Sequence, residues 1–461
     1  MNTNHKLANL QHRIKKHAEQ VDAFSFFNLL TSQQLLSTVE GLLPEYRERK
    51  YPPTETLSMF LSQAMSADRS CQHIVNTMVV QRLTNGLPLH STFTGSYCKA
   101  RQRLPTDMIS ELVRCTGQLI ENQLPKNWHW QGRPVKLVDG TTVTMPDTPE
   151  NQAIYPQQKG QKPGLGFPIC RIVGIMCLAS GSVLNAAIGP YKGKGADEQT
   201  LLRGMLDSFE SGDIVLGDAY FASYFLLAEL MARDIDAVFE QFGARRKSAD
   251  FRKGQRLGAK DHLITYEKPK KKPDWMTKEA YQAAPSTLTL RELKVDKKIL
   301  VTTLLSPKYY SKNALKILYQ DRWHVELNLR NIKTTMGMET FSCKTPEMIE
   351  KEMWIYLLAY NLIRLVMVQS ASLADLLPRQ ISFKHTLQIW LAYRHQQGTI
   401  DNDKSLNVLC VLIAENCVGH RPGRIEPRAV KRRPKPYPLL MKPRSEARET
   451  VKKYGHPRKQ K

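Results

Sequence analysis

Two aspartates follow short apolar runs that have the character of buried β-strands. Asp139 comes after residues 135–138, and Asp218 comes after residues 214–217. Because side chains alternate along a strand, each carboxylate shares a face with apolar residues and lies where that face ends. Two neighbouring ionised carboxylates repel each other, and burial adds to the cost, unless a cation lies between them. The pair therefore predicts a metal site, while a turn at Asp139 and a helix cap at Asp218 stay open as alternatives.

A third carboxylate, Glu326, lies in a segment with helical periodicity. Counting from Tyr319, the residues Arg322, Glu326 and Lys333 follow at intervals of three, four and seven. At about 100° per residue these four side chains fall within about 60° on one helix face, and Arg330 extends the same stripe. A carboxylate among cations and a phenol predicts a metal ligand beside a phosphate-binding surface. The alternative is a solvated helix face on which Arg322 and Glu326 form a simple salt bridge.

The charge of the chain indicates the same kind of partner. The 461 residues include 67 Lys and Arg against 43 Asp and Glu, a formal charge of +24. Residues 421–461 alone hold 15 Lys and Arg against three acids, with prolines that disfavour a long helix before residue 443. A surplus of this size favours nucleic acid as the partner, and the final segment reads as an extended basic arm. The alternative is a surface charge that serves only solubility.

The composition excludes several classes of protein. With 41% hydrophobic and 24% charged residues, the chain is neither collagen-like nor wholly disordered. The most apolar stretch, 354–368, is shorter than a membrane span, and the N-terminus has no secretion signal. Eight cysteines form no C-x-x-C pair, which suits a reducing compartment. We therefore expect a cytoplasmic protein with no membrane association.

The elements that must position these acids are predicted from periodicity. Residues 1–125 and 311–418 have the patterns of helices, and the stretch 125–134 reads as a linker. Between them lie the expected strands and helices of an α/β unit: strands 135–139, 168–179 and 182–188, helix 197–208, strand 214–217, helix 222–232 and strand 237–241. This order predicts an antiparallel meander extended by parallel strands, with helices on the faces of the mixed sheet. Residues 245–310 interrupt it with a basic loop, 268–273, and two strands, 287–295 and 298–305.

The spacing Tyr-x2-Arg-x3-Glu-x6-Lys resembles the signature of a large group of bacterial insertion-sequence transposases, often called YREK, whose members carry a D-D-E triad. By this resemblance Asp139, followed by Gly-Thr-Thr, is the first acid, Asp218 the second and Glu326 the third. Residues 97–104 and 421–435 resemble the N-terminal helical region and the basic C-terminal end of this group. One departure is Ala219, where many members have an arginine, and this puts a phosphate contact there in doubt.

The resemblance implies a fold and a set of domains. The fold class is α/β: a ribonuclease-H-like mixed sheet with helices, interrupted by a β-rich insertion, plus a helical N-terminal domain and a helical, basic C-terminal region. The implied domains are an N-terminal DNA-binding domain, 1–125; a catalytic domain, 133–244 and 311–350; the insertion, 245–310; a helical C-terminal region, 351–420; and a basic tail, 421–461.

The same resemblance implies the reaction. Asp139, Asp218 and Glu326 would be catalytic and would hold two Mg²⁺ ions, with Mn²⁺ able to substitute. The enzyme would cleave the ends of an insertion sequence and join them to target DNA by cut-and-paste transposition, with a hairpin intermediate. Tyr319, Arg322, Arg330 and Lys333 would bind DNA. The partners would be double-stranded DNA, both transposon ends and target, and a second copy of the chain in a homodimeric synaptic complex at the bacterial nucleoid.

Further residues and functions remain open at this stage. By the resemblance, Trp275 could stack on a flipped base, although a packing role is the commoner fate. Lys99, Arg101 and Arg103 could contact phosphates or form structural salt bridges. The competing functions are a catalytically inactive DNA-binding regulator derived from a transposase, and a metal-dependent nuclease that cleaves without joining.

Overall fold

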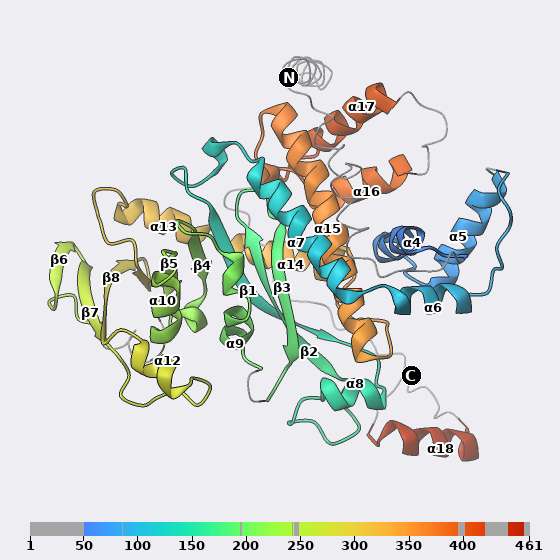
Figure 1. Cartoon of the computed structure of the whole chain (residues 1–461), viewed down its shortest axis with the longest axis horizontal. Coiled ribbons are helices and arrows are strands. Elements are labelled where there is room, and N and C mark those ends of the chain that lie inside the picture. Colours follow the sequence, from blue (N-terminus) through green and yellow to red (C-terminus); the bar gives the residue numbers. More distant parts are fainter. Residues whose placement is uncertain are drawn as a thin grey trace, which may run out of the picture.

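The computed structural model describes residues 50–455 apart from 85, 194–195, 242, 244–248, 395–401 and 420–440. Within this part of the chain one mixed sheet runs through the molecule, in the order β3-β2-β1-β4-β5-β9-β8-β7-β6 (Figure 1). Strands β1 (Val135–Thr144), β2 (Ile169–Cys177) and β3 (Val183–Pro190) form an antiparallel meander. Strands β4 (Ile214–Gly217) and β5 (Asp236–Glu240) then add in parallel beside β1. The predicted mixed sheet is confirmed.

The inserted segment extends this sheet. Strand β9 (Lys298–Thr302) pairs antiparallel with β5, and β8 (Thr287–Val295), β7 (Asp261–Glu267) and β6 (Gln255–Gly258) continue outward. Helix α12 (Lys278–Ala283) lies between β7 and β8 in the chain. The two strands expected from the sequence are present, and β6 and β7 are additions to them. Hydrogen bonds therefore connect the insertion directly to β5, the strand that follows Asp218 in the chain.

The alternation of side chains along β1 separates two layers of core. Val135 and Leu137 pack into one apolar cluster, which also holds Val325 and Leu329. Val138 packs into the other. Helices α13 (Lys312–Gln320), α14 (Trp323–Arg330) and α15 (Pro346–Ala374) contribute to the first cluster, while α10 (Tyr224–Met231) contributes to the second. Asp139 has the strand parity of Val135 and Leu137, so it lies on the face toward α14.

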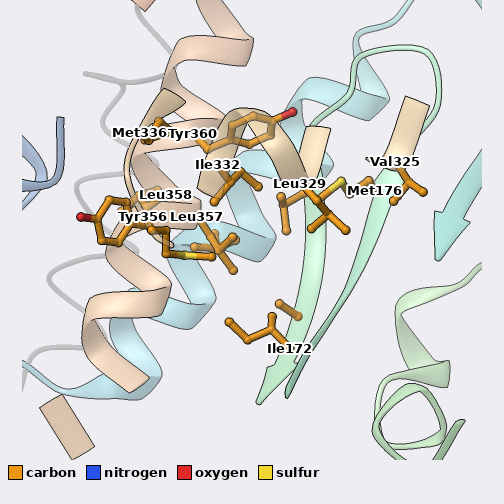
Figure 2. Packing of buried hydrophobic residues seen from close by; sticks show 14 of the residues in the cluster. Ile172, Met176, Val325, Leu329, Ile332, Met336, Tyr356, Leu357, Leu358 and Tyr360 are labelled. Atoms are coloured by element: carbon orange, nitrogen blue, oxygen red, sulfur yellow. The ribbon is translucent and has the colours of Figure 1, made fainter. Parts of the chain in front are cut away.

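Helix α15 is the central helix of the molecule (Figure 1). In the described part of the chain it is the one helix long and apolar enough to cross a membrane, yet 89% of its apolar window is buried inside the protein. Figure 2 shows Tyr356, Leu357 and Leu358 of this helix packed near Ile332 and Met336. The buried Asn361 amide donates to the carbonyls of Val113 and Val183, at 3.1 and 2.8 Å. This burial is typical of a core helix, as the sequence analysis favoured.

The remaining helices surround this core. Within the predicted helical region 1–125, residues 53–84 form two helices, α4 (Pro53–Met65) and α5 (Cys71–Thr84), with a turn at residues 66–70 between them. The predicted linker holds a short η1 turn (Lys126–Trp128), and Trp128 and Trp130 pack against the core. The first 49 residues of the predicted helical region 1–125 lie outside the described residues, as does most of the basic tail. The other helical elements are α6 (Gly95–Arg103), α7 (Thr106–Asn122), α8 (Pro149–Ile154), α9 (Glu198–Arg203), η2 (Leu206–Ser208), η3 (Ala219–Phe221), η4 (Asn331–Thr335), η5 (Pro378–Gln380), α16 (Phe383–Arg394), α17 (Asn402–Glu415) and α18 (Arg444–Tyr454).

Candidate active site

Asp139 lies within β1 rather than at its end, which corrects the sequence expectation. The strand continues to Thr144, and Asp139 pairs with Gly174 of β2. The parallel neighbour β4, however, stops at Gly217. Asp139 therefore lies at the point where the sheet loses one of its strands. A turn at residues 139–140, the alternative reading, is excluded because both residues are in the strand.

Asp218 is the first residue after β4. The parallel register pairs Leu137 with Leu216, so Asp139 and Asp218 occupy equivalent places two residues further along adjacent strands. The Asp218 carboxylate also accepts the backbone N–H of Tyr220 at 2.8 Å through Oδ1, and in this way it caps η3. The capping alternative is thus present together with the predicted side-by-side placement.

The two aspartates interact electrostatically. The pKa of Asp139 is raised from its usual value of 3.8 to about 6, mainly by burial and in smaller part by the negative charges of Asp218 and Glu198. The Gly140 N–H, which donates to Asp139 Oδ1 at 2.8 Å, and the positive charge of Arg322 lower it. Clustered carboxylates with a raised pKa have the electrostatic character of a site for a divalent cation.

The stripe predicted on one helix is not carried by one helix. Helix α13 ends at Gln320, α14 begins at Trp323, and the π-helical η4 follows. Both ends of this broken segment nevertheless reach the strands that carry the aspartates. The Tyr319 hydroxyl donates to the carbonyl of Gly217 at 3.3 Å, and Lys333 Nζ donates to Thr142 O at 2.9 Å and Thr141 Oγ1 at 3.1 Å. These contacts hold residues 319–333 against the sheet.

Glu326 forms the salt bridge that the sequence analysis kept as an alternative. Its Oε1 accepts from Arg322 at 2.9 Å, and the Glu326 side chain is 37% exposed. Across the described residues no three His, Cys, Asp or Glu side chains are grouped closely enough to hold a metal ion. The predicted three-acid group is therefore not assembled in this structure. The positive charge of Arg322 acts on Asp139 as well as on Glu326, so this arginine stands between the acids.

A fourth carboxylate, Glu198, was missed by sequence reasoning. Gly140 has no side chain, and atoms of the Glu198 carboxyl group lie within 2.5 Å of where its Cβ would be. Burial raises the pKa of Glu198, Arg171 opposes this, and Asp218 adds to it. Arg171 Nε lies 3.4 Å from Glu198 Oε1. The signal available in the sequence was an acid in the first turn of the helix that follows β3. Its contact with Gly140, the residue after Asp139, is visible only in the structure.

The remaining predicted DNA contacts lie elsewhere. Arg101 is only 8% exposed and lies over the rings of Phe60 and Tyr97, at 4.8 and 5.2 Å. Its predicted phosphate contact is therefore corrected to a structural role. Lys99 and Arg103 are exposed on α6. Arg330 is exposed and lines a pocket that contains none of the three acids.

Trp275 keeps part of its surface open. Its side chain is 44% exposed, its ring meets Phe225 edge-on, and the guanidinium of Arg203 lies 3.8 Å from the ring centroid. One region of the indole is thus packed, as the commoner reading held. A cation over the ring also supplies charge next to a surface on which a base could stack.

Comparison with known proteins decides the family. The family model described as "Transposase DDE domain" matches residues 130–362, a span that contains Asp139, Asp218 and Glu326. The chain belongs to the DDE transposase family. This DDE transposase is 28% identical over 409 residues to "Transposase InsG for insertion sequence element IS4" of Escherichia coli K12, covering 86% of this chain and 89% of that one. It is an insertion-sequence transposase of the IS4-like kind, as the sequence resemblance implied.

Two further similarities are more distant. A second Escherichia coli K12 protein, "Putative transposase InsZ", is 33% identical over 135 residues, which is 29% of this chain and 44% of that one. Among solved structures, the "Cryo-EM structure of piggyBac transposase synaptic complex with hairpin DNA" has 12% identity and a TM-score of 0.43, and the match covers 88% of this transposase and 87% of that chain. The family match and the InsG relative establish that this enzyme is a DNA transposase.

Proposed function

We propose that this transposase cleaves the ends of its insertion sequence and joins them to target DNA at a site formed by Asp139, Asp218 and Glu326. The observation that carries the proposal is the placement of two acids on adjacent parallel strands, facing the short helix α14 that bears the third. The strand order β3-β2-β1-β4-β5, with the first three antiparallel and the last two parallel, supports a ribonuclease-H-like core. The domain boundaries implied by the resemblance, from 1–125 to 421–461, are part of this proposal.

The acids fit divalent metal ions in their chemistry. Carboxylate oxygens suit Mg²⁺ and Mn²⁺, and a cation bound between Asp139 and Asp218 removes the repulsion that raises the pKa of Asp139. Glu326 would hold the cation together with them, in place of its salt bridge to Arg322. Two bound Mg²⁺ ions would supply charge stabilisation for phosphoryl transfer at this site. The released Arg322 is then placed to neutralise a phosphate beside the reacting bond.

The other signature residues position the DNA. Tyr319 is buried against β4, so its contribution is to hold α13 at the sheet, next to Asp218. Lys333 lies at β1, where its ammonium group donates to Thr141 and Thr142. These two residues follow Asp139 on the strand by two and three positions, so the positive charge is near that carboxylate. We infer that Lys333 and Arg322 bind the backbone phosphates of the transposon end. A hairpin intermediate, a homodimeric synaptic complex and action at the nucleoid in the cytoplasm complete the proposed cut-and-paste reaction.

A cleavage and joining assay tests this function. Purified full-length protein is incubated with a labelled duplex carrying the element's end and with target DNA, with Mg²⁺ or with EDTA. We expect metal-dependent nicking and joining in the wild type, and loss of both in Glu326→Gln. Glu150→Gln removes an exposed acid from α8, outside the site, and should behave as the wild type.

Three results would contradict the proposal, each in a different way. Cleavage that survives in Asp139→Asn or Glu326→Gln would exclude the proposed triad. Binding without cleavage under every metal condition would indicate the regulator. Cleavage without joining would indicate a nuclease.

A further inference from the structure

A basic pocket of about 390 Å³ lies beside α14. We call it the α14 pocket. Its walls come from the turn between β2 and β3, from α14 and η4, from α15, and from the segment that leads into α16. Its basic lining residues are His324, Arg330, Arg364, Arg379 and Lys384, and its lining within the described chain includes no aspartate or glutamate. A pocket of this volume is in the range of sites that bind small molecules or single groups of larger ones.

The α14 pocket faces away from the acids. The lining residues His324, Leu327, Asn328 and Asn331 lie about 100–160° around the helix axis from Glu326, taking about 100° per residue. Arg330, about 40° from Glu326, lies at the edge of the pocket nearest the acids. Asp139 and Asp218 do not line it. Most of the pocket is therefore separated from the candidate active site by the body of α14, and Arg322, the cation that pairs with Glu326, does not line it.

Arg364 carries a positive charge into this pocket without a carboxylate to balance it. Its side chain is 5% exposed. Its Nε donates to the hydroxyl of Tyr360 at 2.7 Å, and its Nη2 donates to Asn328 Oδ1 at 2.5 Å. Its guanidinium also lies 5.5 Å from the ring centroid of Phe383. All of these partners are neutral. A buried cation whose contacts are all neutral is costly, and an anion bound next to it offsets that cost.

The turn between β2 and β3 is shaped to bring its backbone against this arginine. Gly181 has φ of +75°, and a Cβ built there would lie 2.8 Å from the central carbon of the Arg364 guanidinium. The position therefore requires glycine both for its backbone conformation and for space. Ser180 and Ser382 also line the pocket. The Ser180 hydroxyl is hydrogen-bonded to that of Ser182, whereas the Ser382 hydroxyl accepts the His385 N–H and keeps its own proton to donate to an oxygen of a ligand.

The rim retains excess positive charge. Asp321 balances part of it, lying 3.9 Å from Arg379 and 3.5 Å from His324. Arg330 and Lys384 are exposed and take part in none of the ion pairs found among the described residues. The net charge at the opening therefore favours an anion.

We propose that the α14 pocket is a phosphate-binding site distinct from the catalytic acids. Arginine, lysine and hydroxyl donors around a concave site of this size match the tetrahedral oxygens of a phosphate group. The phosphate comes either from the backbone of DNA that passes behind α14 or from a free phosphorylated molecule. The assignment of the phosphate to DNA rests on the function proposed above, whereas the proposal of a phosphate site does not.

Two measurements on the full-length protein test the site. The first is the dissociation constant for inorganic phosphate, measured by calorimetry in a buffer without phosphate. The second is the salt dependence of binding to a fluorescent duplex in EDTA. The pocket variant is Arg330→Gln with Lys384→Gln, which changes two exposed residues and spares the buried Arg364. The matched control is Lys126→Gln with Lys278→Gln, which removes the same charge from exposed positions outside the pocket.

The expected result separates the two variants. The dissociation constant for phosphate should be the same in the wild type and the control. In the pocket variant it should be at least about tenfold higher. If the source is DNA, the slope of log affinity against log salt falls by about 1 in the pocket variant relative to the control. Weakened phosphate binding with an unchanged slope supports the pocket with a free phosphorylated ligand.

Equal phosphate binding and equal slopes in the pocket and control variants would overturn the proposal. The variant Glu326→Gln, in which the pocket residues are unchanged, distinguishes a failure of the pocket proposal from a failure of the proposed transposase function. That substitution should abolish cleavage and leave phosphate binding unchanged. Phosphate binding lost in Glu326→Gln as well would also overturn the proposal, because the pocket would not be independent of the catalytic site.

Discussion

Replacing Asp139 with asparagine should stabilise the metal-free protein while abolishing its reaction. Raising the pKa of Asp139 from its usual 3.8 to about 6 corresponds to about 3 kcal/mol at about 1.36 kcal/mol per pH unit. Between these two pH values the folded protein binds more protons than the unfolded chain, so its stability falls as pH rises. The cost is absent below about pH 4 and complete above about pH 6. Asparagine does not ionise, so the variant does not bear the cost of a buried charge at position 139.

The measurement is thermal unfolding of wild type and Asp139→Asn in EDTA at pH 4 and at pH 8. We expect equal midpoints at pH 4 and a midpoint higher by roughly 3 °C for the variant at pH 8. The matched control is Asp147→Asn, which makes the same substitution at an acid on the chain after β1, outside the group formed by Asp139, Asp218 and Glu198. An equal difference at both pH values would refute the reasoning, because the ionisation of Asp139 would not be its origin.

Divalent metal should reverse the order of stability. A cation that binds the ionised carboxylates stabilises the wild type in proportion to its concentration over its dissociation constant. It should do so less as pH falls below about 6, because metal must displace a proton from Asp139. We expect Mg²⁺ to raise the wild-type midpoint at pH 8 and to leave Asp139→Asn nearly unchanged. An equal shift in both proteins would place the metal elsewhere.

Three further substitutions test the packing around the site. Gly117→Ala places a Cβ 2.2 Å from the backbone oxygen of Val183 and should destabilise the protein by about 2 kcal/mol or more, measured by denaturant unfolding. Gly140→Ala displaces the flexible Glu198 carboxylate rather than backbone, so the fold should persist while the pH profile of cleavage moves to lower pH. Arg101→Met should lower the unfolding temperature and leave the salt slope of DNA binding unchanged, because the side chain is buried.

Each of these has a result that would count against it. Gly95→Ala, where a Cβ meets open space, serves as the control for Gly117→Ala and should be neutral or stabilising. A pH profile that does not move in Gly140→Ala would mean that Glu198 does not influence Asp139. A reduced salt slope in Arg101→Met would restore the phosphate contact predicted from the sequence.

Much of the sheet was predictable because its signals are local. Apolar runs bounded by polar or turn residues located β1 to β5, and the alternation of strands and helices predicted which would pair in parallel. The position of Asp139 within β1 was not predictable from its own strand. It depends on where β4 ends, and that contact joins residues about 80 positions apart in the chain.

The helix that carries Glu326 shows a different limit. Residues 319–333 hold no proline or glycine, so periodicity predicts one continuous helix. The helix instead breaks after Gln320 and passes into the π-helical η4, and both ends of the segment make tertiary contacts with the sheet. Tyr319 is held at Gly217, and Lys333 is held at Thr142. Local pattern could supply the residues of the signature but not the path of the backbone between them.

The interruptions on both sides of α14 bear on how the site works. A continuous helix would fix Glu326 to the orientation of α13, whereas this eight-residue helix is positioned by its own two faces. One face presents Glu326 and its partner Arg322 toward the sheet, and the other lines the α14 pocket. The exchange of Arg322 for a cation at Glu326 and the phosphate binding that we propose would therefore both involve this short element.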